Sequence, residues 1–81
     1  MKKARTKGWV KGRRDAAVTS LDVAIDQMAR GIDLVLQCAL QSKDEGNIEQ
    51  YHKFNDNWID LEKCRDLTGK VRHKLRRMEI S

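Results

Sequence analysis

The sequence contains no proline, and it holds only five glycines, two tryptophans, one tyrosine and one phenylalanine among 81 residues. Proline interrupts helices, and aromatic and β-branched residues favour strands, so this composition predicts long helices rather than a sheet. A chain of this length forms one domain at most, near the lower size at which a protein buries enough apolar surface to fold alone. We therefore expect an all-α protein that gains stability from a partner.

Long apolar runs are also absent from the sequence. No segment approaches the ~18 to 20 apolar residues of a membrane-spanning helix. Charged residues follow the basic N-terminus, where a secretory signal peptide has an apolar stretch. We expect a cytoplasmic protein with no membrane partner.

Cysteine is scarce, since the sequence has only Cys38 and Cys64. In a hairpin that turns near residues 44–47, these two positions lie roughly 16 Å apart at about 1.5 Å of rise per residue. A disulfide needs Cα atoms within about 7 Å of each other. We expect two reduced thiols that act as small, buried or half-buried apolar side chains.

Apolar residues recur with alternating spacings of three and four in the first half of the chain. They are Val18, Leu21, Ile25, Met28, Ile32, Val35 and Ala39. This pattern winds one apolar seam along an α-helix, which we place at about residues 14–43. A neighbouring row of small residues predicts close approach of another backbone along one flank; its members are Ala17, Ala24, Gly31 and Cys38.

A second helix is predicted at about residues 48–78. Its apolar positions are spaced by three or four, near the α-helical period, and they are Ile48, Tyr51, Phe54, Trp58, Leu61, Cys64, Leu67, Val71, Leu75 and Met78. Between the helices, Gly46 can adopt the left-handed conformation that ends a helix, and Asn47 can cap the next one. The sequence therefore predicts a long antiparallel helical hairpin over residues 14–81, preceded by a flexible basic arm over residues 1–13.

Charge is strongly separated along the chain. Residues 1–14 hold seven Lys or Arg and no acid, residues 70–81 hold five against one acid, and residues 15–69 hold eleven acids against five Lys or Arg. A hairpin brings both basic segments to one pole. The candidate nucleic-acid-binding residues there are Lys2, Lys3, Arg5, Lys7, Trp9, Lys11, Arg13, Arg14, Lys70, Arg72, Lys74, Arg76 and Arg77.

Several interpretations of this pole remain open. Its cations can neutralise phosphates while Trp9 stacks on an exposed base. The basic end of the second helix can also meet an acidic groove of a partner protein or, least favoured because its apolar face is narrow, an anionic membrane surface. Alternatively, the charges are simply solvated and Trp9 packs on Met78 or Ile80.

Surplus apolar surface points to a protein partner. Several leucines lie off the seam of the first helix, where a second helix cannot cover them. The candidate protein-interface residues are Leu34, Leu36, Leu40, Tyr51, Phe54 and Trp58. We expect either a homodimer that forms a four-helix bundle or an apolar groove that another protein occupies.

Catalytic motifs are missing. The sequence has no glycine-rich phosphate loop, and His52 near Cys38 would supply only two metal ligands. We expect no catalytic residues, cofactor, metal or small-molecule substrate. The favoured function is that of a small non-enzymatic regulatory protein, of the antirepressor, inhibitor or adaptor type, that binds and modulates a partner protein. The alternative is a dimeric regulator whose basic termini bind DNA or RNA.

Overall fold

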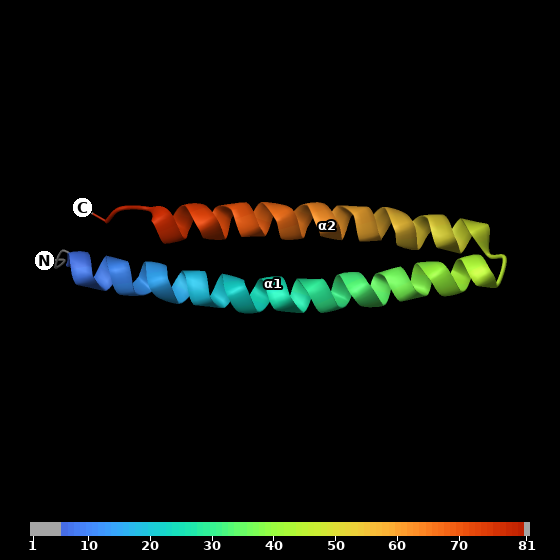
Figure 1. The fold of residues 1–81 in the computed structure, drawn as a ribbon, viewed down its shortest axis with the longest axis horizontal. Helices are drawn as coiled ribbons and strands as arrows, with labels where there is room; N and C mark the ends of the chain where they lie inside the picture. The colour runs from blue at the N-terminus through green and yellow to red at the C-terminus, as the bar shows by residue number, and fades with distance from the viewer. Residues whose placement is uncertain (1–5, 81) are drawn as a thin grey trace, which may run out of the picture.

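The computed structural model describes residues 6–80, which form a hairpin of two antiparallel α-helices with both termini at the same end (Figure 1). Helix α1 spans Lys7–Asp44 and helix α2 spans Ile48–Arg77. The hairpin measures 64 × 26 × 15 Å. Over the described residues there is no strand, so the predicted all-α hairpin is confirmed.

Helix α1 begins at Lys7, seven residues before its predicted start. Thr6 caps it, because its Oγ1 accepts a hydrogen bond from the backbone N–H of Trp9 at 3.1 Å. A capping hydroxyl and the absence of proline let the helix continue through Gly8 and Gly12 despite a propensity loss of about 1 kcal/mol for each. Residues 7–13 of the predicted flexible arm are therefore helical, and Lys2, Lys3 and Arg5 lie outside the described residues.

The turn agrees with the sequence-based prediction. Gly46 has a φ of 78°, in the region that favours glycine, and the Asn47 side chain accepts a hydrogen bond from the Gln50 backbone N–H at 3.1 Å. Ser42, only 1% exposed, links the two helices: its hydroxyl donates to the Cys38 carbonyl and accepts from Gln50 Nε2, both at 2.8 Å. These bonds fix the register with which α2 folds back on α1.

The α1 seam faces α2 as predicted, but the core that it forms is thin. Val18, Ile32 and Ala39 are the buried hydrophobic residues among those described, and Ser42 is the buried polar one. Other seam residues, such as Ile25 and Met28, are half-buried. Ten large hydrophobic residues in the described part of the chain are exposed. The hairpin therefore leaves much of its apolar surface uncovered.

Helix α2 follows its predicted apolar face only as far as Leu61. The half-buried positions spaced by three and four along the whole helix are Tyr51, Phe54, Trp58, Leu61, Arg65, Thr68, Arg72 and Leu75. After Leu61 the next apolar residues, Cys64 and Leu67, are each three positions further on. Two spacings of three in succession turn these side chains away from the α1 seam. Four residues predicted to face inward are consequently exposed, namely Cys64, Leu67, Val71 and Met78. Ile48, at the start of α2, is exposed as well.

Two expectations about small residues are also corrected. Cys38 and Cys64 are free thiols, as predicted, but both are exposed rather than buried. A Cβ atom added to Gly31 would meet no atom within 4 Å, so α2 does not approach that flank of α1 closely. The row from Ala17 to Cys38 thus runs along the edge of the seam, with Ala24 and Gly31 half-buried and Ala17 and Cys38 exposed.

Candidate functional site

Arg14 links α1 to the C-terminal end of α2, at the end of the hairpin opposite the turn. Its Nη1 donates to the Leu75 carbonyl at 3.0 Å and to the Met78 carbonyl at 2.6 Å, and its Nε donates to Asp15 Oδ1 at 2.7 Å. The side chain is only 12% exposed. Carbonyls in the last turn of a helix carry partial negative charge and lack the usual i+4 donors. The Leu75 carbonyl accepts a long bond from the Met78 N–H, at 3.3 Å, so the Arg14 guanidinium supplies a stronger donor. Arg14 was predicted to contact phosphates, whereas the structure places it in the contact that joins α1 to the end of α2.

Replacing Arg14 with methionine should loosen the end of α2 while leaving the turn intact. Hydrogen bonds to charged groups contribute about 1.5–3 kcal/mol, so amide protection near Leu75 should fall by about 10- to 100-fold. Hydrogen exchange resolved along the chain measures this loss. Arg13→Met is the matched control, because the neighbouring Arg13 is exposed and its guanidinium lies over the Trp9 ring. Equal loss of protection in both variants would contradict the capping role.

Arg72 is also held within the hairpin. Its Nη1 donates to Asp22 Oδ1 at 2.6 Å, and its Nε is buried without a hydrogen-bond partner in the described part of the chain. The pair joins the helices in the half of the hairpin nearest the termini. Arg72 was predicted to contact nucleic acid, but its guanidinium already balances the Asp22 carboxylate.

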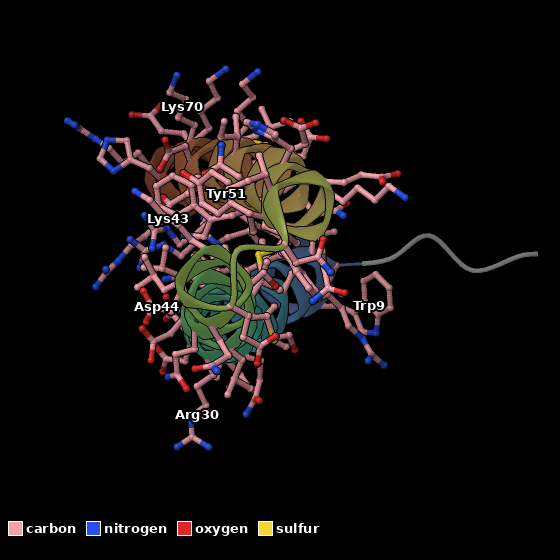
Figure 2. The ribbon with its side chains drawn as sticks, turned by 90° about the vertical axis from the view of Figure 1, so that its right-hand side faces the viewer. Trp9, Arg30, Lys43, Asp44, Tyr51 and Lys70 are labelled. Atoms are coloured by element: carbon pink, nitrogen blue, oxygen red, sulfur yellow. The ribbon has the colours of Figure 1, made fainter. Side chains whose placement is uncertain are left out.

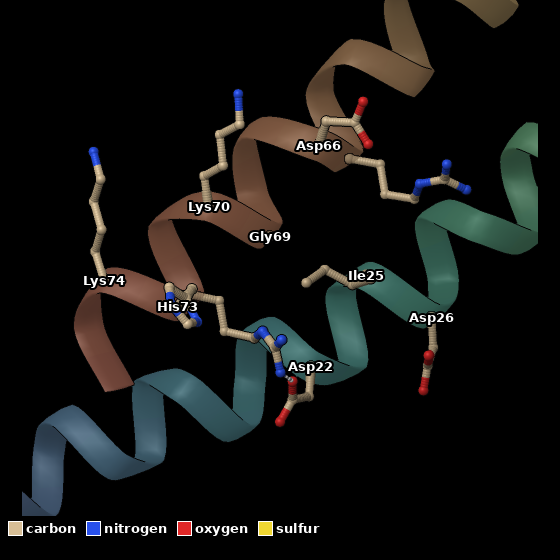
Figure 3. Close-up of a pocket in the computed structure, with 10 residues that line it drawn as sticks. Asp22, Ile25, Asp26, Asp66, Gly69, Lys70, His73 and Lys74 are labelled. Carbon is tan, nitrogen blue, oxygen red and sulfur yellow. Dashed lines mark hydrogen bonds and ion pairs between the residues drawn. The ribbon is translucent and has the colours of Figure 1, made fainter. Parts of the chain in front are cut away.

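Beside this pair lies an open groove of about 900 Å³ between the helices (Figure 3). Gly69 leaves space in its wall, since a Cβ atom there would meet nothing within 4 Å. The ionisable residues that line the groove carry both signs and are Asp22, Asp26, Arg65, Asp66, Lys70, Arg72, His73 and Lys74. Because acids and bases alternate around it, the groove does not present a single charge to a ligand.

The remaining basic residues form an exposed cationic pole, which we define as Lys7, Lys11, Arg13, Lys70, Lys74, Arg76 and Arg77. Within residues 6–80, none of these seven makes an ion pair. The Arg13 guanidinium lies 5.1 Å from the centre of the Trp9 ring, a cation–π distance. The hairpin thus brings most of the predicted phosphate-binding residues in its described part towards its open end, opposite the turn, whereas Lys70, level with about residue 24 of α1, lies near its middle. The Trp9 ring lies against the Arg13 guanidinium.

The six predicted protein-interface residues do not form one surface. Tyr51, Phe54, Trp58 and Leu36 are half-buried, and the three aromatic residues belong to the α2 seam. Leu34 and Leu40 are 60% and 50% exposed. They are six residues apart on α1, so they point about 120° away from each other at 3.6 residues per turn. The aromatic side chains therefore serve mainly the hairpin's own core.

A different surface is more continuous, and we call it the uncharged face. It comprises Ala17, Ser20, Ala24, Gln27, Gly31, Leu34, Cys38 and Gln41 of α1, with Cys64, Leu67, Val71 and Met78 of α2. Leu34 and Cys38 of α1 line a shallow groove together with Gln50 of α2. Cys64, Val71 and Met78 follow Gln50 at multiples of seven residues, so they lie on the same side of α2. Leu67 is 63% exposed and lies between Asp60 and Lys74, which form a polar rim. The sequence predicted one row of this surface, from Ala17 to Cys38, as a packing flank, but the α2 residues and the second uncharged row of α1 were not recognised as part of it.

The opposite side of α1 is acidic. Its carboxylates between residues 15 and 33 are Asp15, Asp22, Asp26 and Asp33. Viewed from the turn, Lys43 and Tyr51 lie on one side of the hairpin and Trp9 lies on the other (Figure 2). Lys43 Nζ is 5.7 Å from the Tyr51 ring centre. The two sides of α1 therefore differ in charge.

Neither described helix contains a stretch long and apolar enough to cross a bilayer. No three metal-ligating side chains gather within residues 6–80. Comparison of the chain with protein-family models, curated proteins and solved structures gave no match.

Proposed function

We propose that this protein is a small, non-enzymatic regulator that acts by packing its uncharged face against another helical surface. Homodimerisation into a four-helix bundle is part of the proposal, because a second hairpin supplies a surface of this kind. The observation that carries it is the exposure of Leu67, Val71 and Met78 on one side of a hairpin with a thin core. Binding would modulate a partner by occupying or reshaping the surface that the partner offers.

The energetics favour this face over the rest of the surface. Full burial of an exposed leucine, valine or methionine side chain stabilises by about 1.5–3 kcal/mol. Leu67, Val71 and Met78 are 63%, 43% and 53% exposed, so about half of that range remains to be gained at each. Over residues 17–41 the α1 part of the face carries no charge, so no ion has to be desolvated there. The acidic side of α1 would incur that penalty at several positions.

Site-directed photo-crosslinking in cells tests the proposal. A photoreactive amino acid at position 67 should yield a discrete adduct, either with a second copy or with another protein. The same group at position 23 is the matched control, since Val23 is also exposed but lies on the side of α1 that faces away from α2. A smear or no product at position 67, or identical products at both positions, would count against the uncharged face.

A second candidate function is phosphate-dependent binding of nucleic acid by the cationic pole. The observation that favours it is the set of seven exposed cations without ion pairs in the described part of the chain. Exposed cations that make no internal ion pair can release counterions from a phosphate backbone, and binding of this kind is steeply salt-dependent. Such binding would be largely independent of base sequence.

A further inference from the structure

We infer that the occupant of the uncharged face is a second copy of this chain, packed antiparallel, so that the two cationic poles lie at opposite ends of a four-helix bundle. This inference rests on the proposed association through the uncharged face and adds the identity and direction of the partner. It follows from the size of the face, the axial position of its apolar residues and the distribution of charge.

The size of the face suits self-association. The two larger dimensions of the hairpin, 64 × 26 Å, enclose about 1,700 Å², and a standard interface buries roughly 800 Å² on each partner. Contact over half of the face is therefore sufficient. With so few buried hydrophobic residues, a hairpin of this size needs additional apolar burial to be stable.

The position of Leu67 points to a twofold axis across the middle of the hairpin. Asp22 contacts Arg72 and Ser42 contacts Gln50, which places Leu67 level with residues 25–27 of α1. That level is the midpoint of α1, which spans Lys7–Asp44. A twofold axis perpendicular to the bundle at this level sets Leu67 against the partner's Leu67 and lets the hairpins overlap along their whole length.

The small residues of α1 fit the same arrangement. An axis at the midpoint, between residues 25 and 26, brings the two α1 helices together there, with Ala17 level with the partner's Leu34 and Gly31 level with the partner's Ser20. The small side chains among these positions permit close approach of helix backbones. The space beside Gly31, where a Cβ atom would meet nothing within 4 Å, is thereby filled by the partner.

Charge decides the direction of packing. A parallel dimer would place two poles of seven exposed cations side by side, and like charges repel. An antiparallel dimer instead separates the two sets of cations and brings Lys7 and Lys11 level with the partner's turn, where Asp44, Glu45 and Glu49 lie. The uncharged face therefore defines the contact surface, and the charges favour antiparallel over parallel packing.

A spin-label distance measurement on the full-length chain tests the inference. A single cysteine introduced as Asp44→Cys, with Cys38→Ser and Cys64→Ser, marks the end of α1. The antiparallel dimer predicts about 55 Å between the labels, because each lies about 18 residues from the axis at 1.5 Å per residue. A parallel dimer keeps both labels at one level, about 30 Å apart or less, given the ~10–12 Å diameter of each helix.

Sedimentation of the same purified protein gives the mass, and Leu67→Glu should halve it while Val23→Glu leaves it unchanged. A monomer at all concentrations would overturn the inference without removing the proposed function, provided that position 67 crosslinks to another protein. A dimer with the short label distance would overturn the orientation. A dimer that is insensitive to Leu67→Glu would overturn the choice of face.

Discussion

Replacement of Ile32 by alanine is expected to lower the free energy of unfolding by about 2–5 kcal/mol, the usual range for deletion of a buried isoleucine side chain. Ile32 is 4% exposed and is the largest of the three buried hydrophobic residues in the described part of the chain. Small domains have only about 5–15 kcal/mol of stability, so this loss removes a large part of the total free energy of unfolding. Circular dichroism during urea unfolding measures it.

The matched control is Leu40→Ala. Leu40 lies two turns along the same helix and is 50% exposed, on the side away from the uncharged face. Its truncation should change stability by less than about 1 kcal/mol, because little buried volume is lost. Comparable destabilisation by the two substitutions would show that the thin core between α1 and α2 is not what holds the hairpin together.

The first helix and the turn were predictable because their signals are local. The spacing from Val18 to Ala39 repeats every heptad, and Gly46 followed by Asn47 meets the backbone and capping needs of a tight turn. The start of α1 was placed too late, since the charges and glycines of residues 7–13 outweighed the cap that Thr6 provides. A capping residue is a short signal that is easily overlooked.

The second half of α2 was not predictable from its own apolar pattern. The seam of α1 imposes a period of 3.5 residues, and α2 has to match it even where its apolar residues follow another register. Arg65, Thr68 and Arg72 therefore occupy inward positions, while Leu67 and Val71 are exposed. Tertiary packing decided which side chains faced inward, and the displaced apolar residues became part of the uncharged face.

The roles of Arg14 and Arg72 depend on long-range register. Arg14 reaches carbonyls 61 and 64 residues away, and Arg72 pairs with a carboxylate 50 residues away. Composition shows only that both belong to basic segments, so they were grouped with residues that face solvent. The alignment of α2 along α1 determines that these two arginines contact the other helix, whereas the residues of the cationic pole remain exposed.

Neutralising four residues of the pole, with Lys70→Gln, Lys74→Gln, Arg76→Gln and Arg77→Gln, is expected to weaken binding of nonspecific DNA by about 10²- to 10⁴-fold at low salt, if the second candidate function holds. The slope of log K against log salt should become shallower by up to about 3.6, since each phosphate contact contributes about 0.9. Fluorescence anisotropy of a labelled duplex over a salt series measures both quantities. The effect should be similar for unrelated sequences, because phosphates carry no base identity.

The control removes the same number of charges elsewhere, with Arg30→Gln, Lys43→Gln, Lys53→Gln and Lys63→Gln. These four side chains are exposed and lie along the middle and turn end of the hairpin, outside the pole. Both variants have the same net charge, so a general attraction between a basic protein and a polyanion predicts equal losses. A localised site predicts a much larger loss for the pole variant. Equal losses, or no binding by the unmodified chain at low salt, would remove the pole as a nucleic-acid site and leave the uncharged face as the functional surface.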